Sequence, residues 1–104
     1  MNELTSIKKQ GLKLLIVEDN QMIQFALKEM LKQLGCTAKF VDDGKKALAS
    51  YRSDYHLILM DIEIPKLDGI EVTQIIRSIE KNHKFKNVPI VAMTSHYGEP
   101  EYSG

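Results

Sequence analysis

Short runs of apolar residues alternate along the chain with segments whose apolar residues recur every three or four positions. Four apolar runs have the length of strands that are buried on both faces of a parallel sheet, and they cover residues 12–17, 36–41, 55–60 and 88–93. Three segments between them have the spacing of amphipathic helices, and their apolar stripes lie within residues 23–34, 45–52 and 70–81. Asp19 or Asn20 can cap the first helix, and Gly35 is suited to end it.

This order of elements predicts an α/β fold, a doubly wound parallel sheet whose right-handed crossovers place helices on both faces. In such sheets, ligands bind beyond the carboxyl ends of the strands, at the point where the strand order reverses. We expect one domain over residues 12–97, with a leader at 1–11 and an irregular tail at 98–104.

Acidic and hydroxyl side chains follow three of the predicted strands. Glu18 and Asp19 come directly after the first strand, and Asp61 comes after the third. Carboxylates in these places would repel a bare phosphate but attract a hard divalent cation, so the sequence predicts a hydrated magnesium site. A carboxylate beside magnesium can act as a nucleophile towards phosphorus, and Thr94, after the fourth strand, offers a hydroxyl for a phosphoryl oxygen.

Composition excludes several classes of function. Fourteen basic residues balance fourteen acidic ones, which argues against nucleic acid or an anionic membrane as the main partner. No apolar run approaches the roughly 18 residues that a membrane span needs. The single Cys36 cannot form an intrachain disulfide. We therefore expect a cytoplasmic protein that binds neither nucleic acid nor a membrane.

Three motifs together carry a resemblance to a known family. The first is the strand that ends in Glu18-Asp19-Asn20, and the last is the strand that ends in Thr94-Ser95. Between them, Asp61 is followed by Pro65 and by the pair Asp68-Gly69. With these motifs the chain resembles a response-regulator receiver domain, the phosphoacceptor module of two-component signalling, over the whole of the predicted domain. The resemblance implies a flavodoxin-like receiver fold.

The resemblance also implies roles for the residues at the strand ends. Asp61 would be the phosphoacceptor, and Thr94 would be the switch hydroxyl that moves towards the phosphoryl group. Mg²⁺ would be bound by the side chains of Asp19 and Asp61 and by the backbone carbonyl of Glu63. The Glu18 carboxylate would bind the ion either directly or through water. Glu63 and His96 would flank the path of attacking water and tune dephosphorylation.

The partner implied by the resemblance is a histidine kinase or a histidine phosphotransfer protein, whose phosphohistidine donates the phosphoryl group. Phosphorylation would then switch the binding of a further partner. No enzymatic activity is expected beyond self-phosphotransfer from this donor and slow autodephosphorylation.

The sequence departs from the family after the fourth predicted strand. Receiver domains continue with a helix, a fifth strand that ends in a lysine, and a last helix, whereas no Lys or Arg follows Lys86 here. We therefore expect a fold that lacks the last strand and the last two helices. Its exposed sheet edge would favour self-association or marginal stability.

Two other functions remain open at this point. The absent lysine favours a receiver-like interaction module that is never phosphorylated. A phosphatase of the haloacid-dehalogenase type also uses an aspartate nucleophile and magnesium, but it places the nucleophile after the first strand and the acidic pair last, which is the reverse of the order here.

Overall fold

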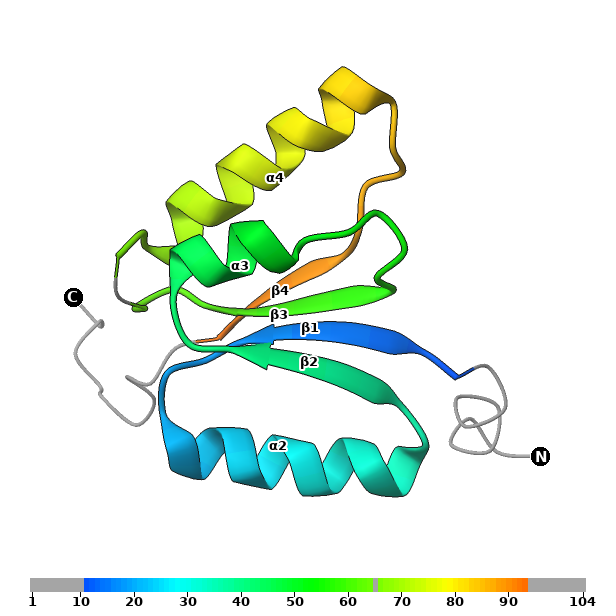
Figure 1. Ribbon diagram of the computed structural model, residues 1–104, viewed down its shortest axis with the longest axis vertical. Coiled ribbons are helices and arrows are strands. Elements are labelled where there is room, and N and C mark those ends of the chain that lie inside the picture. Colours follow the sequence, from blue (N-terminus) through cyan, green and yellow to red (C-terminus); the bar gives the residue numbers. More distant parts are fainter. Residues whose placement is uncertain (1–10, 65, 94–104) are drawn as a thin grey trace, which may run out of the picture.

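Four parallel strands form the centre of the structure, a computed structural model that describes residues 11–64 and 66–93. The strands are β1 (Lys13–Val17), β2 (Thr37–Val41), β3 (Leu57–Asp61) and β4 (Ile90–Met93). Their order in the sheet is β2-β1-β3-β4 (Figure 1). The predicted doubly wound parallel sheet is confirmed, and the strand order reverses between β1 and β3, whose carboxyl ends lie side by side.

The last two strands begin two residues later than the apolar runs predicted. Leu57 pairs with Leu14 at the start of β3, and Ile90 pairs with Ile58 at the start of β4. β3 also runs one residue further than predicted, because Asp61 pairs with Met93. Apolar character alone cannot locate these ends, since Val88 is buried without belonging to the ladder.

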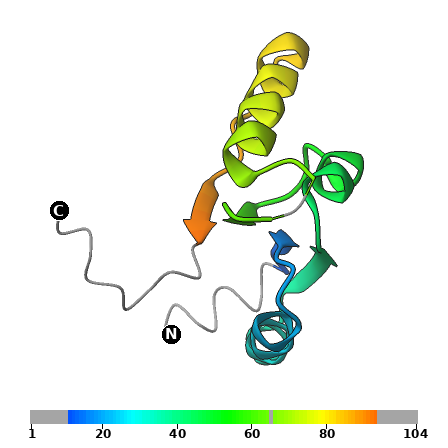
Figure 2. The same cartoon turned by 90° about the vertical axis from the view of Figure 1, so that its left-hand side faces the viewer.

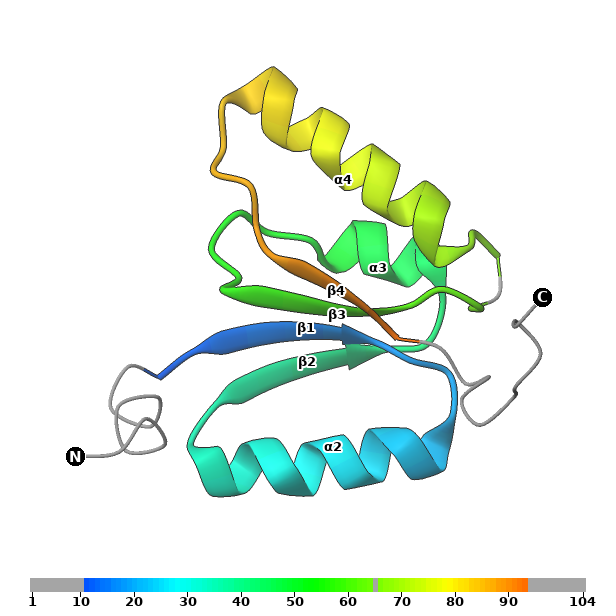
Figure 3. The ribbon, with the colours of Figure 1, turned by 180° about the vertical axis from the view of Figure 1, so that it is seen from behind.

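Three helices cover the two faces of the sheet: α2 (Gln21–Leu34), α3 (Gly44–Ser50) and α4 (Gly69–His83). α2 lies on one face, and α3 and α4 lie on the other (Figures 1 and 2). The view from behind shows the same arrangement, with β4 at the end of the sheet nearest α4 (Figure 3). Within the described part of the chain, no helix is long and apolar enough to span a membrane.

The sheet separates two clusters of buried apolar side chains. The larger cluster lies between the sheet and α3 and α4, and it includes Leu15, Ile58, Val72 and Ile76. The smaller cluster lies between the sheet and α2 and includes Leu31. β1 and β3 contribute to both clusters, which explains why their sequences are apolar on both faces.

Polar side chains at the strand ends also start the helices. Asn20 caps α2 by accepting hydrogen bonds from two backbone N–H groups of its first turn, as predicted. Asp43 caps α3, and Asp68 forms a capping box with Glu71 at the start of α4. Gly35 ends α2 in the left-handed conformation, with φ 76°. Each helix therefore begins at the same edge of the sheet.

Two glycines allow the loop after β3 to pack closely against its neighbours. A Cβ at Gly69 would lie 2.6 Å from the carbonyl oxygen of Asp61, and a Cβ at Gly44 would lie 2.3 Å from that of Leu67. Both contacts are with backbone, which cannot move aside as a flexible side chain can. The loop that follows Asp61 is thereby held against the start of α3 and of α4.

A buried carboxylate joins α4 to the segment that leads into β4. Glu80 is fully buried, and its oxygens accept a hydrogen bond from the Val88 N–H at 2.8 Å and pair with Arg77 at 2.8 Å. The Tyr51 hydroxyl lies 3.5 Å from Glu80. Burial, followed by the neighbouring Glu80 carboxylate, raises the pKa of Tyr51. Every buried side-chain polar atom in the described residues has a partner.

The outer edge of β4 pairs with no strand in the described part of the chain. Val91 on this strand is 49% exposed. The described residues contain four strands and three helices, in agreement with the predicted order. Self-association through the β4 edge stays a prediction.

Candidate functional site

Three carboxylates meet at the carboxyl ends of β1 and β3. One oxygen from each of Glu18, Asp19 and Asp61 lies within 4.8 Å of the others. Glu18 and Asp61 are each only 3% exposed, whereas Asp19 faces solvent. The structure thus brings together the three acidic side chains that the sequence placed after the first and third strands. Within residues 11–64 and 66–93, no other cluster of potential metal ligands meets this criterion.

The loop that carries Glu18 is held from several directions. The Glu18 N–H donates to the carbonyl of Val41 at 3.0 Å, and the Asn20 N–H donates to Glu18 Oε2 at 2.9 Å. Gln24 reaches back from the first turn of α2, and its Nε2 donates to the Glu18 carbonyl at 2.5 Å. These bonds fix both the backbone and the carboxylate of Glu18. Gln24 was not predicted as a site residue, because its only signal in the sequence is a polar residue in the first turn of a helix.

Asp61 is positioned by the ladder and by the loop that follows it. Its Oδ1 accepts a hydrogen bond from the Glu63 N–H at 2.9 Å. Asp61 pairs with Met93 of β4, and the Ile62 N–H donates to the Met93 carbonyl at 3.1 Å. Thr94 follows Met93 in the sequence, and both Thr94 and His96 lie outside the described residues. Their predicted roles, and that of the Glu63 carbonyl, stay predictions.

The pair Asp42-Asp43 follows β2 and has a structural role at the start of α3. The Asp42 carboxylate forms an ion pair with the Lys46 ammonium group at 2.9 Å. The Asp43 carboxylate caps α3 by accepting a hydrogen bond from the Lys46 backbone N–H at 2.7 Å. That backbone hydrogen bond is the main reason why the pKa of Asp43 is lowered, with the charge of Lys66 adding to it. Lys66, which has a φ of 70°, lies 3.5 Å from the Asp43 carboxylate. The sequence did not indicate this ion pair.

The electrostatics of the cluster favour a cation. Burial raises the pKa of Glu18 to about 6, and the nearby carboxylates of Asp61 and Asp19 add to the rise. The hydrogen bond from the Asn20 N–H opposes it. Two buried carboxylates and one exposed carboxylate supply the hard oxygen donors that Mg²⁺ prefers, and the exposed side leaves room for water ligands. The residues therefore fit a divalent cation held by Glu18, Asp19 and Asp61.

Replacing Glu18 by glutamine is expected to stabilise the metal-free chain at neutral pH by about 2 kcal/mol. Glutamine keeps an oxygen for the Asn20 N–H but carries no charge. The pKa of Glu18 rises from 4.5 to about 6 on folding, so the folded state binds the proton more tightly. The stability that protonation contributes is fully present below about pH 4.5 and is lost as the pH rises through about 6.

Urea unfolding in the presence of a chelator checks this expectation at pH 4.5 and pH 7. The advantage of Glu18→Gln over the wild type should grow between these two pH values. Glu29→Gln, on the exposed side of α2, removes an acidic charge without touching the cluster and serves as the control. An advantage that is equal at both pH values, or that Glu29→Gln reproduces, would contradict the explanation.

Comparison with known proteins identifies similar domains. The family profile "Response regulator receiver domain" matches residues 14–103. Peroxide stress-activated histidine kinase mak3 of Schizosaccharomyces pombe is 37% identical over 89 residues, which cover 82% of this chain and 4% of that protein. The chain thus spans only a small part of the curated relatives that it matches, from 4% to 14% of their length.

Two solved structures are similar in both sequence and fold. One is the receiver domain of sensor histidine kinase PA1611 from Pseudomonas aeruginosa PAO1, with a magnesium ion coordinated in its active site cleft. It is 35% identical with a TM-score of 0.73, and the match covers 90% of this chain and 75% of that one. The other is the complex of the Saccharomyces cerevisiae histidine phosphotransfer protein Ypd1 with the receiver domain of Ssk1, at 31% identity and a TM-score of 0.69 over 80% of this chain and 61% of that one.

Proposed function

The chain belongs to the response regulator receiver domain family, and from this premise we propose that Asp61 accepts a phosphoryl group from a phosphohistidine donor. Receiver domains are generally signalling modules of two-component and phosphorelay proteins rather than enzymes. The observation that carries the proposal is the cluster of Glu18, Asp19 and Asp61 at the point where the strand order reverses. It combines a buried carboxylate nucleophile with neighbouring acidic ligands for a cation.

The reaction is a transfer between two nucleophiles. An oxygen of the Asp61 carboxylate forms a bond to phosphorus while the phosphorus–nitrogen bond of the donor histidine breaks. The imidazole nitrogen leaves with the electron pair and takes up a proton. The hydrogen bond from the Glu63 N–H holds the Asp61 carboxylate in one orientation, so little reorganisation is needed before attack.

The neighbouring carboxylates both oppose and prepare this reaction. Glu18 and Asp19 raise the negative charge at the place where a phosphoryl group must arrive. Mg²⁺ held by Glu18, Asp19, Asp61 and the Glu63 carbonyl would neutralise that charge and orient phosphoryl oxygens. The role of Asn20 and Gln24 is to keep Glu18 turned towards Asp61 through the bonds to its carboxylate and carbonyl.

The remaining roles rest on the order of residues after β3 and β4. Thr94 follows the residue that pairs with Asp61, and we assign its hydroxyl to a phosphoryl oxygen of the product. Glu63 and His96 flank the path of the water that hydrolyses the acyl phosphate. The donor is a histidine kinase or a histidine phosphotransfer protein, and the solved complex that contains Ypd1 supports the second of these classes.

Incubation of the chain with acetyl phosphate and Mg²⁺ tests the proposal. The expected product is an adduct that is stable in acid, labile in base and located on Asp61 by mass spectrometry after trapping. The yield should fall to background when a chelator replaces Mg²⁺. If no adduct forms although Mg²⁺ binds, the chain is a receiver-like interaction module. If unrelated phosphomonoesters are hydrolysed with turnover, it is a phosphatase.

A further inference from the structure

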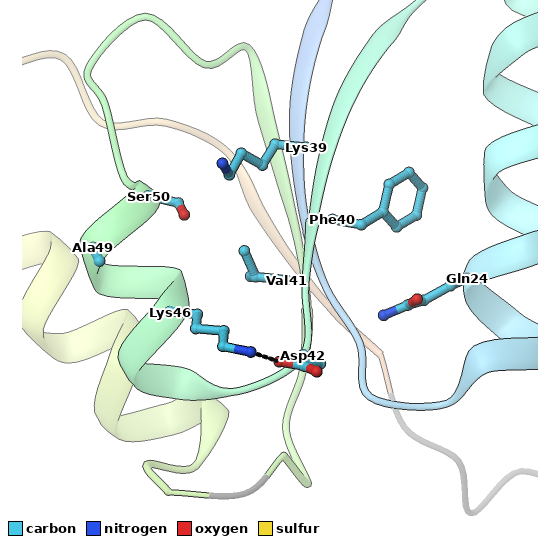
Figure 4. A pocket seen from close by; sticks show the side chains of 8 residues that line it. All are labelled: Gln24, Lys39, Phe40, Val41, Asp42, Lys46, Ala49 and Ser50. Carbon is cyan, nitrogen blue, oxygen red and sulfur yellow. Dashed lines mark hydrogen bonds and ion pairs between the residues drawn. The ribbon is translucent and has the colours of Figure 1, made fainter.

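The outer edge of β2 lies in a groove between α2 and α3. A cavity of about 420 Å³ at the carboxyl end of the strand is lined from three elements, by Gln24 of α2, by Lys39 to Asp42 and by Lys46 of α3. Figure 4 shows Lys39 and Lys46 on the α3 side of the strand and Gln24 and Phe40 on the α2 side. A second cavity of about 570 Å³ continues along the strand and shares Lys39 and Phe40 with the first. Together the two cavities flank the β2 edge along most of its length.

The backbone of β2 presents unpaired groups to this groove. The Thr37 N–H donates to the Leu12 carbonyl at 2.9 Å, and the Val41 carbonyl accepts from the Glu18 N–H at 3.0 Å, so both residues face β1. In a parallel ladder, alternate residues bond to opposite sides. Ala38 and Phe40 therefore turn their N–H and C=O groups outward, and no strand among the described residues pairs with them.

The groove is basic although the chain as a whole has no net charge. Lys28, Lys32 and Lys39 line the second cavity, and none of its lining residues is acidic. The ion pairs in the described part of the chain involve none of these three lysines. The one acidic residue of the first cavity, Asp42, already pairs with Lys46.

We propose that this groove binds an extended acidic polypeptide segment, which adds to β2 as a further strand of the sheet. The outward groups of Ala38 and Phe40 would supply main-chain hydrogen bonds, and Phe40 would supply an apolar contact. Side chains of a strand alternate between its two faces, so acidic residues would meet Lys39 on one side and Lys28 and Lys32 on the other.

Titration of the ¹⁵N-labelled chain with a short peptide that repeats two glutamates and two valines tests the proposal, because both faces of this peptide carry glutamate when it is extended. The amide signals of Ala38 and Phe40 are expected to shift, and their hydrogen exchange is expected to slow. A peptide with lysine in place of each glutamate should not bind. A glutamate–valine peptide with N-methylated backbone should bind more weakly, because it cannot complete the ladder.

Charge reversal separates specific docking from a general charge effect. Lys39→Glu is expected to weaken binding of the acidic peptide about fivefold or more. Lys86→Glu, at an exposed lysine far along the chain, makes the same change in net charge and should leave binding unchanged. The proposal would be overturned if the two variants weakened peptide binding equally, or if the amide signals of Ala38 and Phe40 did not shift. Lys39 would then be a residue that prevents the β2 edge from pairing with other strands.

A second copy of the chain is the alternative occupant, and the same measurements identify it. In that case, slow exchange at Ala38 and Phe40 would develop without peptide as the chain concentration rises. Sedimentation would then detect dimers of the wild-type chain, and Lys39→Glu would change the dimer dissociation constant. That outcome would also overturn the proposal.

Discussion

The Asp61→Asn variant is expected to form no detectable adduct with acetyl phosphate under conditions in which the wild type is phosphorylated. An amide oxygen is a far weaker nucleophile than a carboxylate, so the variant lacks the group that attacks phosphorus at the end of β3. The fold should persist, because the side-chain oxygen of asparagine can still accept the hydrogen bond that the Glu63 N–H donates to Asp61 in the wild type. Mass spectrometry of the intact chain measures the loss.

Asp42→Asn is the matched control for this prediction. Asp42 also follows a strand at the same edge of the sheet, but it is exposed and pairs with Lys46 instead of joining the cluster. Its variant should be phosphorylated to the same extent as the wild type. A persistent adduct in Asp61→Asn, or an equal loss in Asp42→Asn, would mean that phosphorylation occurs elsewhere.

The second large effect is expected at Glu80, far from the cluster. Glu80→Ala should lower the free energy of unfolding by about 3 kcal/mol. The substitution leaves the Val88 N–H without its acceptor and removes the carboxylate that pairs with Arg77. It also leaves a void among Tyr51, α4 and the segment that enters β4. Urea unfolding in the presence of a chelator measures the change.

Glu80→Gln keeps the test informative if the alanine variant does not fold. Glutamine retains an oxygen for the Val88 N–H and most of the volume, but it loses the charge that pairs with Arg77. Its cost should be about half that of the alanine variant. An alanine variant as stable as the glutamine variant would show that the hydrogen bond to Val88 contributes little.

Local patterning was sufficient to predict the class of fold and the place of the site. Residues 14–17 are apolar at successive positions, which favours a short strand that is covered on both faces. Because parallel strands end at the same edge, Glu18 and Asp61 could be placed together without coordinates. The start of the first helix was predictable because a cap such as Asn20 acts within its own turn, whereas the structure alone revealed that Asp68 caps α4.

The burial of α4 shows where patterning fails. Helical spacing made Ile75 and Ile79 as good candidates for the inner face as Ile76. In the structure Val72, Ile76 and Glu80 are buried, whereas Ile75 is 39% exposed. Glu80 is tolerated inside because it pairs with Arg77, one turn earlier on α4, and accepts the hydrogen bond of the Val88 N–H. The contact with Val88 forms only after the chain has turned back from the end of α4, and no local pattern in the sequence indicates it.

The order of residues along the chain was therefore enough to identify the alternating elements, the helix caps and the three carboxylates, since each depends on neighbours in sequence or on the shared edge of parallel strands. Only the tertiary structure decided which way Gln24 turns, that Gly69 lies against the Asp61 carbonyl, and that no described strand pairs with the basic edge of β2. These features depend on how loops and elements pack against one another in three dimensions, which local propensity does not determine.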